Sequence, residues 1–363
     1  MQAHIGPAGR GQGGSMQRGV GLFGIGCLLV AATTASAQQA SVTVFVGVHV
    51  VPMIQEQVLR NQTVVVTGDR ITAIGPNGRV AVPEGATRID GRGKFLMPGL
   101  TDMHVHFYHP IRPSTRAPHV EYIRHSQDLA LLFVANGVTT VRNMWGTAAH
   151  LTLRKEIEAG HVLGPRIATT GVTTDGVPAT WPSTREVRNA SEAAVAVSAD
   201  HDAGFDAVKV YTGLSAEACD GIVAAARRIG MPVWGHVPTA VGLSRVLASG
   251  RGSIEHGDGY LRAAQLDSIA PTAPARPETV DPKKLADLVA ATVAANVWNC
   301  PTLTVIEKVT EMDRWPALKA IPLMRFVPPP VLAGWNPTLD FRYQDAPAER
   351  RAAAQRRFEF SLS

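Results

Sequence analysis

The stretch MPGLTDMHVHFYHP, residues 97–110, places Asp102, His104 and His106 at alternate positions behind a Pro-Gly turn. Successive side chains of a β-strand point to opposite faces, so these three would project to one side of a strand. Two imidazoles on one strand face can bind one zinc ion. The alternative is that both histidines are ordinary packed residues of a buried strand, and an H-x-H pair alone does not decide between the two.

The hydrophobic pattern of the sequence changes at Phe95, where short apolar runs begin to alternate with helical patterns. The predicted strands are residues 95–106, 138–144, 166–171, 207–211, 233–237, 253–256 and 297–305. The predicted helices between them are residues 121–136, 148–159, 186–203, 216–229, 242–248 and 282–295. No G-x-G-x-x-G phosphate loop opens the series, which therefore favours a TIM-like (β/α)₈ barrel over an open doubly wound α/β sheet.

The eighth strand of such a barrel is apparently missing. A further helix is predicted from about Pro347, and the sequence stops at Ser363. Before the barrel, residues 42–50 and 62–67 are β-rich, and Gly68-Asp69 indicates a hairpin. The predicted domains are a leader at 1–37, a small β unit at 38–95 and an incomplete barrel at 96–363.

Composition excludes several classes of protein. Of the 363 residues, 45% are hydrophobic and 18% are charged, which is enough for a sizeable core. The net charge of +5 comes from scattered basic residues without a Lys/Arg run, so nucleic-acid binding is not expected. Beyond the leader only Cys219 and Cys300 remain, which predicts two free thiols, with a single disulfide as the alternative.

The leader has the pattern of a secretory signal peptide. Arg10 and Arg18 precede an apolar run at 20–32, and Ala35-Ser36-Ala37 follows as an A-x-A cleavage site. We expect cleavage after Ala37 and a secreted or periplasmic protein, with translation starting at Met1 or Met16. The apolar run is short for a bilayer span, so a stable membrane anchor is the less favoured alternative.

Three more residues end or interrupt predicted strands. Lys209 lies inside an apolar run, where a charged amine is costly unless it is neutralised or paired. It is either an edge lysine that reaches solvent or a lysine whose neutral amine captures CO₂ as a carbamate. His236 and His256 each end a strand. A single such histidine is usually a packed core residue, but four histidines and one lysine at successive strand ends indicate a metal site.

These motifs resemble the amidohydrolase superfamily. They run in the order PGLTDMHVH (98–106), GVTTVRNM (137–144), GPRI (164–167), DAVKVY (206–211), GHV (235–237) and SIEHG (253–257). The chain is most similar to the branch of imidazolonepropionase-like hydrolases and secreted, prolidase-like Xaa-Pro dipeptidases, over residues 42 to about 305. The resemblance implies a metal-bearing barrel beside a β-sandwich.

The resemblance also implies a ligand set. His104 and His106 would bind a first Zn²⁺ or other divalent metal, and Lys209, as a carbamate, would bridge to a second metal held by His236 and His256. Arg142 and Tyr211 are candidates for binding a substrate carboxylate. The family's general-base aspartate at the end of the eighth strand has no counterpart here, because Asp340 and Asp345 do not follow a β-run. No catalytic base is therefore assigned.

The function expected from this resemblance is hydrolysis of a C–N bond in a small amide, by metal-activated water. A cyclic amide, an N-acyl amino acid and an Xaa-Pro dipeptide are the substrate types, and a homo-oligomer is left open. The first alternative is a truncated, non-catalytic remnant that lacks the eighth-strand aspartate. The second, a solute-binding or structural α/β protein, does not explain histidines at four strand ends.

Overall fold

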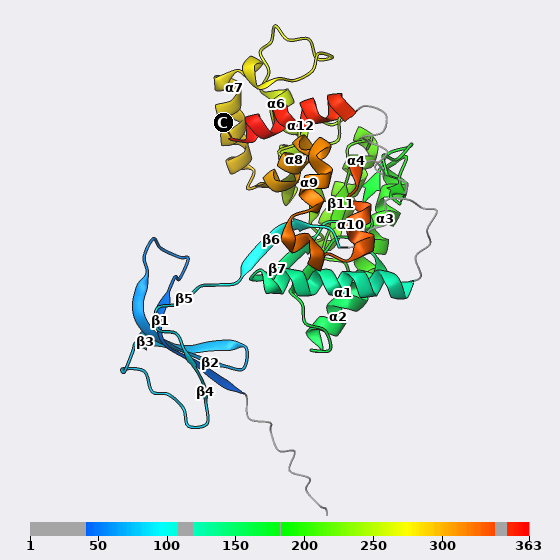
Figure 1. Cartoon of the computed structure of the whole chain (residues 1–363). Coiled ribbons are helices and arrows are strands. Elements are labelled where there is room, and N and C mark those ends of the chain that lie inside the picture. Colours follow the sequence, from blue (N-terminus) through cyan, green and yellow to red (C-terminus); the bar gives the residue numbers. More distant parts are fainter. Residues whose placement is uncertain (1–40, 108–118, 182, 338–346, 363) are drawn as a thin grey trace, which may run out of the picture. The chain divides into compact units, whose positions relative to one another are not determined.

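The computed structural model describes residues 41–107, 119–181, 183–337 and 347–362. The chain divides into two compact units, Met1–Met97 and Pro98–Ser363 (Figure 1). The predicted leader at 1–37 lies outside the described residues, and so do Asp340 and Asp345.

The N-terminal unit is one five-stranded sheet. Its strands are β1 (Val42–Val50), β2 (Leu59–Thr67), β3 (Arg70–Pro76), β4 (Thr87–Asp90) and β5 (Phe95–Leu96). β1, β2 and β3 form an antiparallel meander, and β4 and β5 both pair parallel to β1. Val48, Val50 and Val64 are buried on this sheet. The described part of this unit contains one sheet, so the β-sandwich remains a prediction.

The C-terminal unit is an α/β structure in which every strand pairing is parallel. Its strands are β6 (Leu100–Val105), β7 (Val138–Asn143), β8 (Arg166–Thr169), β9 (Thr174–Asp175), β10 (Arg185–Glu186), β11 (Val208–Val210), β12 (Val233–Gly235), β13 (Ser253–Glu255) and β14 (Trp298–Cys300). Each of the seven strands predicted from the sequence contains one of them.

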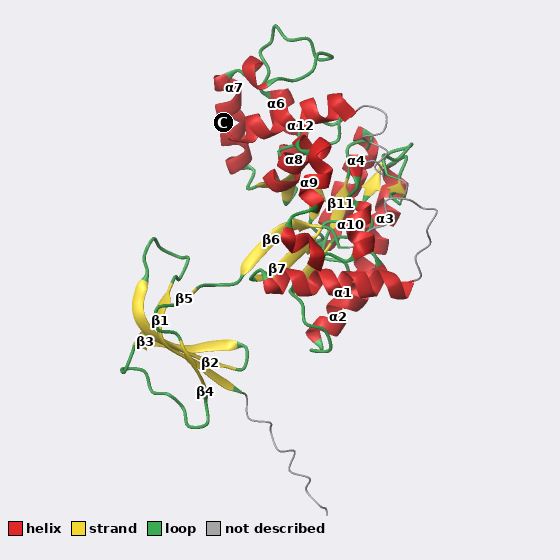
Figure 2. Ribbon diagram, in the orientation of Figure 1, coloured by secondary structure: helices red, strands yellow, loops and turns green. Residues whose placement is uncertain are grey.

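Helices lie outside the strands of this unit (Figure 2). They are α1 (His119–Ala135), α2 (Ala148–Glu158), α3 (Ala190–Ala203), α4 (Ala216–Ile229), α5 (Leu243–Ala248), α6 (Tyr260–Ala263), α7 (Pro282–Ala294), α8 (Leu303–Thr310), α9 (Trp315–Lys319), α10 (Pro329–Gly334) and α12 (Pro347–Leu362). All six predicted interstrand helices and the helix at Pro347 are present.

The parallel strands form two sheets, in the orders β6-β7-β8 and β10-β9-β11-β12-β13-β14. A parallel bridge between Thr170 and Ala207 joins the ends of β8 and β11. The described residues do not close the strands into a barrel, and none of those after β14 forms an eighth strand. The structure thus has the α/β alternation of the predicted barrel without its closure.

Two predicted strands have different limits in the structure. The run at 95–106 is split between the two units by Met97, Pro98 and Gly99. The run at 297–305 stops at Cys300, because Pro301 has no N–H for a strand ladder and Thr302 adopts a left-handed φ of 51°. Residues 303–305 therefore begin helix α8.

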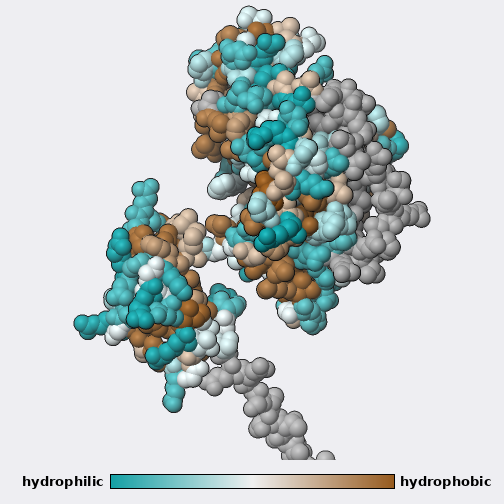
Figure 3. Space-filling model, in the orientation of Figure 1, coloured by the Kyte–Doolittle hydropathy of each residue, from teal (hydrophilic) through white to brown (hydrophobic). Residues whose placement is uncertain are grey.

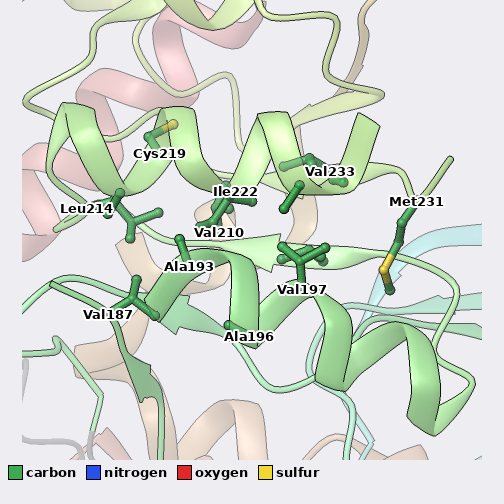
Figure 4. Close-up of a cluster of buried hydrophobic side chains, with 14 residues drawn as sticks. Val187, Ala193, Ala196, Val197, Val210, Leu214, Cys219, Ile222, Met231 and Val233 are labelled. Carbon is green, nitrogen blue, oxygen red and sulfur yellow. The ribbon is translucent and has the colours of Figure 1, made fainter. Parts of the chain in front are cut away.

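The largest apolar cluster packs α3 and α4 against β11 and β12 (Figure 4). Ile222 is fully buried at its centre. Asn189 and Ser215 cap the N-termini of the two helices by accepting backbone hydrogen bonds. Each helix ends at a glycine with a left-handed φ, Gly204 and Gly230.

Apolar residues on the face shown in Figure 3 lie in several separate groups among hydrophilic ones. Some large apolar side chains of the C-terminal unit are widely exposed, among them Val293 and Trp298. Within the described part of the chain, none of the helices combines the length and apolar character that a membrane crossing requires.

Ile222→Ala tests the α3–α4 cluster. Truncation of this fully buried side chain leaves a cavity that a packed core cannot fill, so we expect the free energy of unfolding to fall by about 2–5 kcal/mol. Ile229→Ala, at the exposed end of the same helix, is the matched control and should cost about 1 kcal/mol or less. Chemical denaturation measures both, and equal losses would contradict the packing described.

Candidate metal centre

The predicted histidines come together in the C-terminal unit. His104 lies near the carboxyl end of β6 and His106 directly after it, while His236 and His256 directly follow β12 and β13. Parallel strands present their carboxyl ends at one edge, which explains the convergence. The ring centroids of His106 and His104 are 5.2 Å apart, those of His104 and His256 4.6 Å, and those of His256 and His236 4.7 Å.

His104 is held by a carboxylate on one side of its ring. Its Nδ1 lies 2.7 Å from Oε2 of Glu255, and its Nε2 lies 3.2 Å from Nε2 of His106. Because a carboxylate only accepts hydrogen bonds, Nδ1 carries the proton and Nε2 keeps its lone pair.

The other two buried histidines are held in the same way. His236 Nδ1 bonds to Oδ2 of Asp258, and His256 Nδ1 lies 2.6 Å from the hydroxyl of Thr302. Metal-binding histidines commonly fix their second ring nitrogen with such a partner. The 3.2 Å between Nε2 of His104 and Nε2 of His106 matches the separation of about 3.3 Å for two imidazoles on tetrahedral zinc. The donor set therefore fits a metal.

Burial favours the neutral form of three of the imidazoles. Desolvation lowers the pKa of His104 and His256 well below the usual value, and that of His236 to a smaller extent. The positive charge of Lys209 adds to the effect on all three rings, although Asp258 opposes it at His236 and His256. Neutral imidazole is the form that binds metal, so these three rings need not lose a proton before coordination.

Lys209, in the middle of β11, is 2% exposed. None of the described residues forms a hydrogen bond or ion pair with its amine. Burial lowers the pKa of Lys209 to about 8, although the charges of Glu255 and Asp258 oppose the shift. A buried amine of this kind is partly neutral near pH 8, and the neutral amine is the form that reacts with CO₂.

Arg142, on β7, is held by contacts within the protein. Its guanidinium donates to the carbonyl of Met103 at 2.7 Å, to Ser253 at 3.1 Å and to Glu255 at 2.8 Å, and it stacks over Trp234. The residue is 6% exposed. These partners account for Arg142 without a substrate, and the predicted contact with a substrate carboxylate finds no support in its position.

Tyr211, directly after β11, lies beside the histidines. Its ring centroid is 4.2 Å from that of His236, and its hydroxyl accepts a hydrogen bond from Trp181 at 2.9 Å. Trp181 packs edge-on against Trp145, whose ring lies 5.9 Å from that of His106. These aromatic side chains therefore extend from one end of the row of imidazoles to the other.

The backbone is strained where it places His256. Both His256 and Thr302 have left-handed φ values, 60° and 51°, which are uncommon for non-glycine residues and unfavourable for a β-branched one. Their side chains bond to each other, and the N–H of His256 donates to the carbonyl of Cys300 at 2.7 Å. Such strain is concentrated at functional sites.

Gly235 allows β12 to approach Lys209 closely. A Cβ at this position would lie 2.3 Å from the carbonyl oxygen of Val210 and 3.2 Å from Cδ of Lys209. Its φ of 131° is also one that residues with a side chain rarely adopt. Glycine is thus required directly before the ligand candidate His236.

Several residues that support the centre were not identified from the sequence. They are Glu255, Asp258, Thr302 and Arg357. The acidic residues that flank His256 in E-H-G-D are a signal that could have indicated two of them. His104, Glu255 and Cys300 also offer possible ligand atoms within 4.8 Å of one another. Glu255 is engaged by Arg142 and Ser253, so we assign it to support of the ligands.

Comparisons with known proteins agree with this geometry. The sequence model of the amidohydrolase family matches residues 95–322, more than half of the chain. Adenine deaminase 2 from Bradyrhizobium sp. (strain ORS 278) is 37% identical over 76 residues, which are 21% of this chain and 13% of the relative. Imidazolonepropionase from Rubrobacter xylanophilus (strain DSM 9941 / JCM 11954 / NBRC 16129 / PRD-1) is 46% identical over 48 residues, 12% of each chain.

The matched segments thus span about an eighth of these curated relatives. A solved prolidase complexed with N-methylphosphonate-L-proline superposes with a TM-score of 0.60 at 21% identity. The superposition covers 87% of this chain and 76% of that one. At this level of identity the likeness establishes the fold.

Lys209→Met tests the buried amine. The folded-state pKa of about 8 lies below the ordinary 10.5, so folding at pH 7 carries the penalty of burying a charge. We expect the methionine variant to be more stable than the wild type by about 1–3 kcal/mol at pH 7, in metal-free and CO₂-free buffer. The advantage should shrink as the pH rises from about 8 through 10.5.

Denaturation of both chains across this pH range measures the effect. Lys283→Met, at an exposed position of α7, is the control and should leave stability almost unchanged. A Lys209→Met variant less stable than the wild type at pH 7 would show that the amine has a stabilising partner.

Proposed function

Because the chain belongs to the amidohydrolase family, we propose that it hydrolyses a C–N bond of a small amide in a metal-dependent reaction. The observation that carries the proposal is the convergence of four imidazoles beside the buried Lys209, whose amine has no hydrogen-bond partner among the described residues. The proposed ligands of one or two divalent ions are His104, His106, Lys209 as a carbamate, His236 and His256. Zinc suits imidazole and carboxylate-type oxygen donors at such a centre.

Bound metal would lower the pKa of a water molecule and polarise the scissile carbonyl. The contribution of the chain itself is to orient the ligands. Glu255, Asp258 and Thr302 hold the Nδ1 atoms of three histidines, which leaves the Nε2 atoms for coordination. Because the pKa of Lys209 is lowered, part of its amine is neutral and can react with CO₂ to form a carbamate. The two oxygens of that carbamate could bind two ions.

We propose a substrate of the size of a cyclic amide, an N-acyl amino acid or an Xaa-Pro dipeptide. The structural likeness to a prolidase with a bound proline phosphonate supports the last of these. Trp145, Trp181 and Tyr211 flank the imidazoles and suit an apolar ring or side chain next to the scissile bond. Of the residues predicted to contact substrate, Tyr211 remains a candidate.

A second candidate function is metal binding without catalysis. The observation in its favour is that the acidic side chains described at the centre, Glu255 and Asp258, are each engaged by an arginine and a histidine. Hydrolysis needs a group that is available to move the proton from water to the leaving nitrogen. Metal content without turnover of any amide would support this alternative.

We also propose export from the cytoplasm. The basic residues, apolar run and A-x-A site of residues 1–37 support secretion or a periplasmic location, with cleavage after Ala37. N-terminal sequencing of the protein recovered from the secreting cell tests this directly.

The double variant His104→Ala, His106→Ala tests the metal assignment. Elemental analysis of the purified chain should show the loss of at least one metal equivalent, because two converging Nε2 donors are removed. The matched control is His161→Ala, His201→Ala, which removes two exposed histidines and should leave the metal content unchanged. Unchanged metal in the first variant would refute the ligand assignment.

Turnover is measured on the same preparations with a panel of Xaa-Pro dipeptides, N-acyl amino acids and cyclic amides. We expect hydrolysis by the metal-loaded wild type and by the control, and none by the His104/His106 variant. A wild type that holds metal but hydrolyses no member of the panel would favour the second candidate function.

A further inference from the structure

Two carboxylates lie behind the imidazoles, each between an arginine and a histidine. Glu255 contacts Arg142 and His104, and Asp258 contacts Arg357 and His236. The two carboxylates come from one short segment, at the end of β13 and directly after it. The same arrangement thus occurs twice, on two different histidines of the centre.

Glu255 is completely buried, and each of its oxygens has a separate partner. Oε1 accepts from Arg142 at 2.8 Å and from Ser253 at 2.6 Å, and Oε2 faces Nδ1 of His104 at 2.7 Å. Arg142 in turn donates to the carbonyl of Met103, the residue next to His104. The arrangement therefore fixes both the ring of His104 and the backbone beside it.

Asp258 has the corresponding position at His236. One carboxylate oxygen faces Nδ1 of His236, and the other accepts from Arg357 on α12. Arg357 also donates to the carbonyl of His256 at 2.8 Å. Helix α12, which follows the rest of the described chain, is thus connected to two of the histidines through one side chain.

Each of the two carboxylates faces an arginine with one oxygen and a histidine ring nitrogen with the other. A guanidinium can only donate, and a carboxylate can only accept, so the ring nitrogen that faces the carboxylate has to carry the proton. We propose that Glu255 and Asp258 are positioning residues that fix the Nδ1–H tautomers of His104 and His236, with both Nε2 lone pairs available to a divalent metal. The metal part of this inference rests on the proposed function, whereas the tautomer part does not.

An amide in place of either carboxylate makes a sharp test. Glutamine and asparagine have one oxygen and one NH₂ group, and the oxygen has to face the arginine, because NH₂ cannot pair with a guanidinium. The NH₂ group then faces the imidazole and donates to Nδ1. The proton of the ring moves to Nε2, which removes the lone pair that the metal needs.

The experiment compares the wild type with Glu255→Gln and Asp258→Asn. Nitrogen-15 NMR of the metal-free chains at pH 8 identifies which ring nitrogen carries the proton. We expect Nδ1–H at His104 and His236 in the wild type, and Nε2–H at His104 in Glu255→Gln and at His236 in Asp258→Asn. Competition with a chelator for Zn²⁺ should show an affinity about 10–100-fold lower in each variant.

Asp200→Asn is the matched control. Asp200, on helix α3, is also a buried carboxylate that accepts from an arginine, Arg185 at 2.7 Å, and it contacts none of the four histidines. Its amide variant should change stability but neither the tautomers nor the zinc affinity. If Glu255→Gln does not fold, Asp258→Asn still decides, because the side chain of Asp258 is 13% exposed and that of Glu255 is fully buried.

Three outcomes separate this inference from the proposed function. Reversed tautomers with weakened zinc binding support both. Reversed tautomers in a protein whose wild type binds no zinc support the positioning role and refute the metal centre. Unchanged Nδ1–H tautomers in both variants, or zinc affinities equal to that of the wild type, overturn the inference.

Discussion

The burial of ionisable groups behind the carboxyl ends of the parallel strands constrains the C-terminal unit more than any other feature. A charge inside a protein is tolerated when it has a partner, and the loss of that partner is strongly destabilising. Glu255 satisfies this condition through Arg142, Ser253 and His104, which come from three different strands. The relative positions of β6, β7 and β13 are therefore coupled to one carboxylate.

Lys209 is the exception to this arrangement. It is as buried as Glu255, and yet its amine lacks a hydrogen-bonding partner among the described residues. A chain selected for stability alone would replace it with an apolar residue of similar length. Its position in the middle of β11, beside imidazoles with lowered pKa values, supports the proposal that its amine serves a reaction or a ligand. This is the physical basis for expecting a carbamate there.

Most of the order of strands and helices in the C-terminal unit was predictable, because strand and helix periodicities alternate clearly after Phe95. The histidines and Lys209 were predictable for the same reason, since each lies at or in a recognisable apolar run. The features that were not predicted depend on contacts between segments that are far apart in the sequence. Arg142 and Glu255 are 113 residues apart, and Arg357 and Asp258 are 99 apart. The sequence alone therefore does not reveal that Arg142 contacts Glu255.

Hydrogen bonds within the chain orient the imidazoles of this centre. Three Nδ1 atoms are held by Glu255, Asp258 and Thr302, and the hydrogen bond between His256 and Thr302 joins two residues in unfavourable backbone conformations. Such strain and buried charge lower the stability of the folded chain. The apolar clusters around α3, α4 and α5 offset this loss. Because the rings are already oriented, coordination would require little further loss of side-chain entropy, and affinity would depend mainly on the partners that fix each ring nitrogen.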